Sequence, residues 1–193
     1  MQGEGNERCP FCRKECATSD EETLKDLKKR ADNNNDPFAL REMGSQYRHN
    51  GDMKKAVEYF EKAAELGEAV AHYNLALFYK RGEFYERDED CERFHLKEAS
   101  LGGHPWARHN LGCNEGTFGS IYRAVKHWII CAKMGFEPSL QTLKTCYKEG
   151  DVSKEDFAAA PRGYQAAVDA TKSEQRDKME KIHARRYKEF MSK

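Results

Sequence analysis

Hydrophobic residues recur in the middle of the chain at the three- and four-residue spacing of amphipathic helices. Leu40, Met43 and Tyr47 fall on one helical face. A second run of the same kind, centred on Phe60, follows after Gly51. Glycine interrupts helices because it is conformationally free. This stretch therefore predicts two short helices joined by a tight turn.

The two-helix pattern is repeated along the sequence, and small residues set its register. Gly44, Ala76 and Gly112 occupy equivalent positions, spaced 32 and 36 residues apart. Ala56 and Ala124 each follow twelve residues after the glycine of their copy. A helix pair of this kind can bury its apolar face only against neighbouring copies. The sequence therefore predicts an all-α fold, an α-solenoid of about three to four antiparallel helix pairs.

Prolines and glycines mark where the predicted helices begin and end. Asp52 and Ser153 are suited to cap second helices, since their side chains accept hydrogen bonds from first-turn N–H groups. Proline is tolerated at the start of a helix, as expected at Pro37, Pro105 and Pro138. Left-handed glycines are expected to end the second helices at Gly67, Gly102 and Gly135.

The predicted organisation has seven parts. Pro161 sets the last boundary, because an interior proline costs a helix about 3 kcal/mol. We expect a break near Ala160 and a long helix from Pro161 to about Phe190. The parts are a cysteine-rich tail (1–18), a leading helix and linker (19–35), three repeats (36–67, 68–103 and 104–136), a degenerate fourth repeat (137–160) and a C-terminal helix (161–193).

The repeated unit resembles the Sel-one-like repeat, a branch of the tetratricopeptide-type solenoids. The resemblance covers about residues 36–150. It implies an adaptor without catalytic residues. The matching residues are Leu40, Met43, Gly44, Tyr47, Ala56, Tyr59, Phe60, Ala63, Ala64 and Gly67 in the first copy, Ala71, Leu75, Ala76, Tyr79 and Phe94 in the second, and Ala107, Leu111, Gly112, Ala124, His127, Trp128, Ala132 and Gly135 in the third.

Three cysteines, Cys9, Cys12 and Cys16, lie together near the N-terminus. The first two resemble the last cysteine pair of a RING zinc finger. A structural zinc ion needs four ligands, and the other ligand pairs of such a finger are not found in the sequence. We interpret the segment as a RING remnant and assign it no metal site, although zinc binding with a histidine stays an alternative. The alternative function is a substrate-recruiting part of a RING-type ubiquitin ligase.

Composition and charge favour a protein partner over nucleic acid or a membrane. The 193 residues carry 33 basic and 33 acidic side chains, so bulk charge does not favour nucleic acid. The basic segment after Thr171 leaves nucleic-acid binding as a weaker alternative. No apolar run approaches the roughly 20 residues of a membrane helix. Seven cysteines without a secretory signal predict free thiols in a reducing compartment, so we expect a cytoplasmic protein, with the nucleus not excluded.

No arrangement of residues in the sequence is typical of catalysis. There is no phosphate-binding loop, no HExxH zinc motif and no nucleophile elbow. The histidines are scattered, and the carboxylates occur in charged runs typical of solvated surfaces. We therefore predict a protein that is not an enzyme and needs no cofactor.

The predicted function is a scaffold that binds a peptide or a helix. In arrays of this type the first helix of each pair lines the concave groove. The exposed groove positions combine cations with an aromatic ring, which suits a partner with some acidic character. Aligned on the small residues, these positions are Arg41, Ser45, Arg48, Tyr73, Leu77, Lys80, His109 and Cys113.

Overall fold

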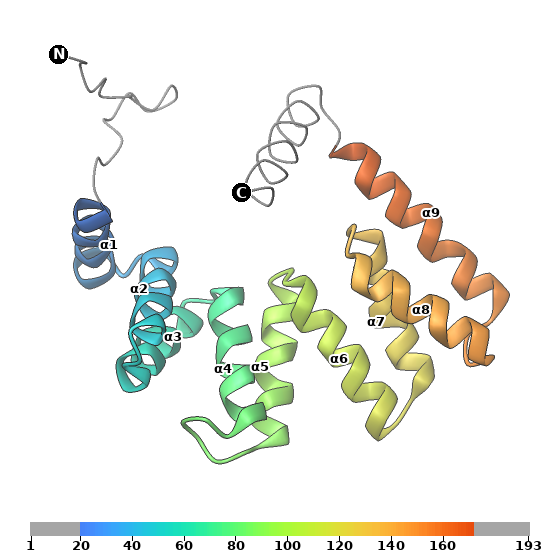
Figure 1. The fold of residues 1–193 in the computed structure, drawn as a ribbon, viewed down its shortest axis with the longest axis horizontal. Coiled ribbons are helices and arrows are strands. Elements are labelled where there is room, and N and C mark those ends of the chain that lie inside the picture. Colours follow the sequence, from blue (N-terminus) through green and yellow to red (C-terminus); the bar gives the residue numbers. More distant parts are fainter. Residues whose placement is uncertain (1–19, 172–193) are drawn as a thin grey trace, which may run out of the picture. The chain divides into compact units, whose positions relative to one another are not determined.

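The structure, a computed structural model, describes residues 20–171. Every regular element in that range is an α-helix, which confirms the all-α solenoid class (Figure 1). Cys9, Cys12 and Cys16, and the ligase alternative that depends on them, lie outside the described residues. The helices are α1 (Asp20–Asn34), α2 (Pro37–His49), α3 (Met53–Glu65), α4 (Ala69–Arg81), α5 (Glu89–Leu101), α6 (Pro105–Phe118), α7 (Ile121–Lys133), α8 (Glu137–Glu149) and α9 (Lys154–Ala170).

The helices form two compact units, the first ending at His104 and the second beginning at Pro105. The first unit contains α1 and the helix pairs α2/α3 and α4/α5, which are the first two predicted repeats. The second contains α6/α7 and α8/α9. No helix between Asp20 and Thr171 combines the length and apolar character needed to cross a bilayer.

The small residues that set the repeat register lie under aromatic rings. A Cβ atom added to Gly44 would stand 2.8 Å from the ring of Phe60, and one added to Gly112 would stand 2.5 Å from Nε1 of Trp128. Phe60 is fully buried in the core of the first unit. Trp128 is buried in the core of the second and donates from Nε1 to the His109 carbonyl at 3.3 Å. In each pair the glycine therefore lets the second helix approach the first.

Side-chain caps hold the predicted helix starts. Asp36 Oδ1 accepts from the backbone N–H of Phe38 at 3.0 Å, and Asp52 Oδ1 accepts from that of Lys55 at 3.1 Å. Ser153 Oγ accepts from the N–H of Asp156 at 3.1 Å. Each bond satisfies an N–H group that has no partner within its helix.

The left-handed glycine predicted to end the second helix of the second repeat is the wrong residue. Gly67 and Gly135 have the expected left-handed φ values of 80° and 82°. Gly102 instead has φ −70°, and its neighbour Gly103 takes the left-handed position with φ 84°. Glycine is required at position 102 for close packing, since a Cβ atom there would stand 2.6 Å from the Cβ of Ala69.

The predicted break near Ala160 is also wrong, because α9 continues through Pro161 to Ala170. Proline at 161 removes the N–H that would bond to the Phe157 carbonyl, and the helix continues in spite of this loss. Ala160 is fully buried, and Phe157 packs against the same core. Burial of this face holds the helix together across the proline. The expected continuation to Phe190 lies outside the described residues.

Candidate functional site

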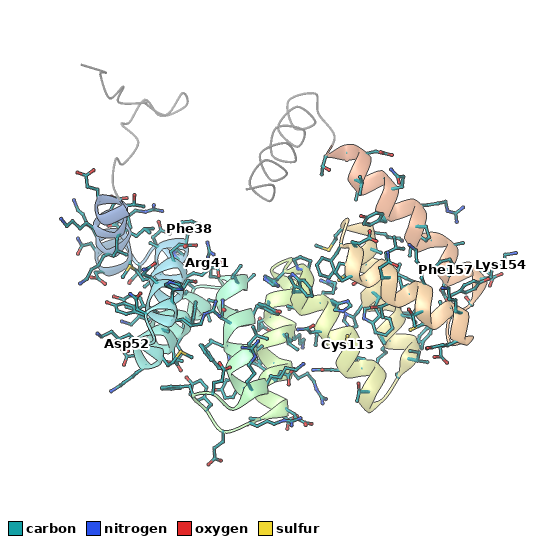
Figure 2. All side chains as sticks on the ribbon, in the orientation of Figure 1. Phe38, Arg41, Asp52, Cys113, Lys154 and Phe157 are labelled. Atoms are coloured by element: carbon teal, nitrogen blue, oxygen red, sulfur yellow. The ribbon has the colours of Figure 1, made fainter. Side chains whose placement is uncertain are left out.

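Six of the eight predicted groove residues lie in the first unit, on α2 and α4, and the other two lie on α6 in the second. Figure 2 shows Arg41 on α2 and Cys113 on α6. We call the first set the α2–α4 surface, and each set is described within its own unit. The α2–α4 surface consists of Arg41, Ser45, Arg48, Tyr73, Leu77 and Lys80.

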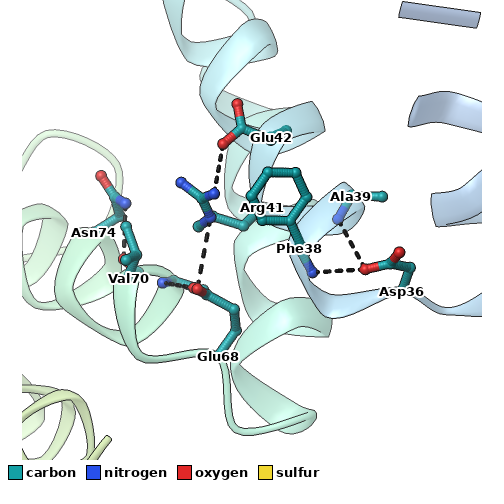
Figure 3. Close-up of polar contacts among 9 residues, drawn as sticks. Asp36, Phe38, Ala39, Arg41, Glu42, Glu68, Val70 and Asn74 are labelled. Carbon is teal, nitrogen blue, oxygen red and sulfur yellow. Dashed lines mark hydrogen bonds and ion pairs between the residues drawn. The ribbon is translucent and has the colours of Figure 1, made fainter. Parts of the chain in front are cut away.

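Arg41 is held by neighbouring side chains rather than projecting freely. Its guanidinium lies 2.6 Å from the carboxylate of Glu42 and 3.6 Å from that of Glu68, and it stands 4.7 Å from the ring centroid of Phe38 (Figure 3). Only 19% of the side chain is exposed. Glu68 also caps α4 by accepting from the N–H of Ala71 at 2.6 Å. Arg41 therefore ties the first helix pair to the start of the second.

Arg48 and Lys80 keep more of their side chains in solvent. Arg48 donates from Nη1 to Asn74 Oδ1 at 2.7 Å, which links α2 to α4. Asn74 is buried and in turn donates to the Val70 carbonyl at 2.8 Å. Lys80 lies 3.5 Å from the carboxylate of the buried Glu92 on α5, yet 48% of its own side chain is exposed. Arg48 on α2 and Lys80 on α4 are therefore both accessible to a partner.

The remaining residues of this surface, Ser45, Tyr73 and Leu77, carry no charge. The ring of Tyr73 stacks on that of His104, with centroids 4.3 Å apart and planes inclined by 24°. Burial lowers the pKa of His104, so the stacked imidazole is neutral near pH 7. Ser45 and Leu77 are half-buried. The α2–α4 surface thus combines two accessible cations with a flat aromatic face.

In the second unit, His109 and Cys113 lie one turn apart on α6. His109 Nδ1 is 2.9 Å from the hydroxyl of Ser139, and its Nε2 is 3.7 Å from the Cys113 sulfur. Its ring also packs edge-on against Phe136 at 5.8 Å. Burial lowers the pKa of His109, so its ring is neutral near pH 7. Ser139 is fully buried, which leaves the imidazole a packing and hydrogen-bonding role.

The site chemistry is that of recognition by charge and contact. Within residues 20–171, no group of three or more His, Cys, Asp or Glu side chains is placed to hold a metal ion. The four cysteines of that range, Cys91, Cys113, Cys131 and Cys146, are free thiols. Burial raises the pKa of Cys131 and of Cys146, which keeps both as unreactive thiols.

Sequence reasoning missed the partners that fix the cations. Phe38, Glu68 and Glu92 are contributed by helix starts and by a second helix, so alignment of first helices alone did not select them. Glu68 and Glu92 each face a cation of a neighbouring helix. A charged residue at a position that should face the core is the one signal that could have pointed to Glu92.

These features define an α-solenoid with a mixed cationic and aromatic surface on its first helices. Neither a family model nor a curated protein matches the sequence. Among solved structures, the chain is similar to c5321, a protective antigen of uropathogenic Escherichia coli strains with an SLR (Sel1-like repeat) fold. That match has a TM-score of 0.64 and 29% identity, and covers 77% of this chain and 33% of that one.

The chain is also similar to a Sel1 repeat protein from Oxalobacter formigenes. The TM-score is 0.59 and the identity 28%, over 64% of this chain and 98% of that one. The two structures support the resemblance to Sel-one-like repeats. This chain spans about a third of the length of the Escherichia coli antigen.

Proposed function

We propose that this chain is a non-catalytic interaction scaffold whose α2–α4 surface binds an acidic peptide or helix of a partner protein. The observation that carries the proposal is the placement of Arg48, Lys80 and Tyr73 on two successive first helices. Likeness to Sel1-type repeat structures supports it, since stacked helix pairs offer extended binding surfaces. An elongated partner can run across α2 and α4 and meet all three side chains.

The ion pairs within the chain leave room for a partner. Lys80 keeps 48% of its side chain exposed while it pairs with the buried Glu92, and an ammonium group has three N–H donors, so a partner carboxylate can approach Lys80 from the solvent side without displacing Glu92. The ring of Tyr73 is already held by His104, so little conformational freedom is lost when a partner packs on it. Arg41 is more deeply held and contributes to the shape of the surface.

The proposal is tested by reversing the accessible charges. The full chain and an Arg48→Glu/Lys80→Glu variant are used to capture proteins from a lysate, and bound proteins are compared by quantitative mass spectrometry. Acidic partners should fall several-fold with the variant, because attraction becomes repulsion. Synthetic peptides from the captured partners should then bind the unsubstituted chain directly in anisotropy titrations.

A Lys54→Glu/Lys97→Glu variant is the matched control. It makes the same change in net charge at exposed positions on α3 and α5, outside the α2–α4 surface. Captured partners should be retained by this control. If both variants lose the same partners, bulk charge governs capture. If neither variant loses any, the α2–α4 surface is the wrong site.

A further inference from the structure

A pocket of about 440 Å³ lies in the first unit between α3, α4 and α5. It shares no lining residue with the α2–α4 surface, although both use α4. Its volume is within the range of ligand pockets in proteins. Six side chains give it chemical character: Glu61 and Glu65 from α3, His72 and Tyr79 from α4, and Phe94 and His95 from α5.

Aromatic rings form one side of the pocket. Tyr79 stacks on His95 with centroids 5.6 Å apart, and Phe94 meets His72 edge-on at 6.4 Å. Phe94 is 56% exposed, so a face of its ring is open to a ligand. The faces of such rings carry partial negative charge and attract cations.

The two histidines add no positive charge to the pocket near pH 7. Their Nδ1 atoms lie 2.9 Å apart. When both rings are neutral, one of these Nδ1 atoms donates to the other. Burial lowers the pKa of His72, and burial together with the charge of His72 lowers the pKa of His95 to about 4. Both lowered pKa values leave the His72–His95 pair neutral near pH 7.

Two carboxylates form the other side. Glu61 and Glu65 are one turn apart on α3, a spacing at which like charges repel. Glu61 accepts from the hydroxyl of Tyr85 at 2.5 Å through one oxygen, which positions its second oxygen. None of the residues that line the pocket is a lysine or an arginine. The pocket therefore carries negative charge that no lining side chain offsets.

We propose that this pocket binds an arginine side chain of a partner protein. The guanidinium lies between the carboxylates of Glu61 and Glu65 on one side and the rings of Phe94 and His72 on the other. Its aliphatic stem covers the exposed face of Phe94. Occupation relieves the repulsion between the two carboxylates and buries apolar ring surface in the same step.

The chemistry of the lining side chains favours arginine over lysine. A guanidinium is planar, stacks on aromatic faces and donates to two acceptors at once. An ammonium ion is more strongly hydrated and loses more on leaving water. Walls that combine rings with a pair of carboxylates suit the planar, weakly hydrated cation.

The test uses the full chain and three small probes. Nα-acetyl-arginine amide, its neutral near-isostere Nα-acetyl-citrulline amide and Nα-acetyl-lysine amide are titrated while ring resonances of His72, His95 and Phe94 are followed by NMR. The arginine probe should shift these resonances saturably, the lysine probe should bind more weakly, and the citrulline probe should leave them unchanged.

Substitutions of pocket residues test whether the arginine probe binds at this pocket. Glu65→Gln and Phe94→Ala should each weaken the arginine probe roughly threefold or more, since each removes one wall of the site. Glu58→Gln, an exposed carboxylate on α3 that does not line the pocket, should bind as the unsubstituted chain does. Equal shifts with citrulline, tighter binding of lysine, absence of shifts, or full affinity in Glu65→Gln would each overturn the proposal.

Discussion

Two glycines of the first helices, Gly44 and Gly112, lie where a side chain would strike an aromatic ring. In a helix interior glycine costs about 0.5–1 kcal/mol relative to alanine, so its presence calls for a reason. The reason is the ring of Phe60 in the first unit and that of Trp128 in the second. Both rings are buried, which leaves them little room to move aside.

Replacing Gly112 by alanine tests this account. The new Cβ atom would stand 2.5 Å from Nε1 of Trp128, so the indole must shift and its bond to the His109 carbonyl must weaken. We expect Gly112→Ala to lower the free energy of unfolding by about 1–3 kcal/mol, the usual cost of overpacking. Urea unfolding followed by tryptophan fluorescence measures the change.

Gly116→Ala is the matched control on the same helix. Its Cβ atom would lie 3.5 Å from the Cβ of Ala124, which is ordinary van der Waals contact. It should be neutral or stabilising by up to about 1 kcal/mol, since alanine favours the helix. Equal losses in the two variants would show that packing against Trp128 does not explain the glycine.

At the scale of the element, α9 shows burial overriding local preference. Proline in a helix interior normally kinks or breaks it. Here the turns before and after Pro161 are held by the buried Ala160 and by Tyr164, which packs against the same core. Gly163 fits closely against Lys133, so the helix backbone approaches α7 directly at this turn. Contacts on both sides of the proline keep the helix continuous.

Removing the proline should therefore strengthen α9. Pro161→Ala restores an N–H donor without changing the buried face, and we expect unfolding free energy to rise by about 1–2 kcal/mol. The gain is reduced by the greater freedom of the unfolded chain. Urea midpoints and helical circular dichroism measure it.

Pro138→Ala provides the comparison, since Pro138 stands in the first turn of α8, where proline is well tolerated. That variant should change stability by less than about 1 kcal/mol. A loss of stability in Pro161→Ala would mean that the proline ring itself is needed for packing.

At the scale of the whole molecule, partly buried histidines make stability depend on pH. Each unit contains histidines whose pKa is lowered by burial. The pKa of His95 falls to about 4. Above the ordinary value of 6.5 the folded and unfolded chains are equally neutral at these rings. Below it, these histidines bind protons in the unfolded chain, whereas in the folded chain their lowered pKa values keep them neutral. Protonation therefore favours the unfolded chain. The residues are His72, His95, His104, His109 and His127.

Stability should consequently fall as the pH is lowered from about 7 to 5, by about 1 kcal/mol or more in total. Urea unfolding at the two pH values measures the fall. His95→Gln retains a hydrogen-bonding side chain but cannot titrate. Its free energy of unfolding should therefore fall less between the two pH values than that of the unsubstituted chain. Lowered carboxylate pKa values, as at Asp36 and Asp52, act only at more acidic pH. Equal unfolding midpoints at both pH values would contradict the prediction.

The sequence by itself determined the repeat, because its small residues and helix caps are local and periodic. Gly44 and Gly112 could be assigned to equivalent positions before their aromatic neighbours were known. Asp52 and Ser153 could be assigned as caps, since a cap depends only on the next few residues. Family resemblance followed from the same positions.

Tertiary structure alone decided which local preferences would be overridden and which charges would meet. Pro161 stays helical because a buried face holds it, which no local pattern reveals. Arg41 is engaged by Glu68, and the pocket of Glu61, Glu65 and Phe94 forms only when successive helix pairs stack. Periodicity predicts which face of a helix is buried, but the partner of each side chain depends on contacts between distant residues.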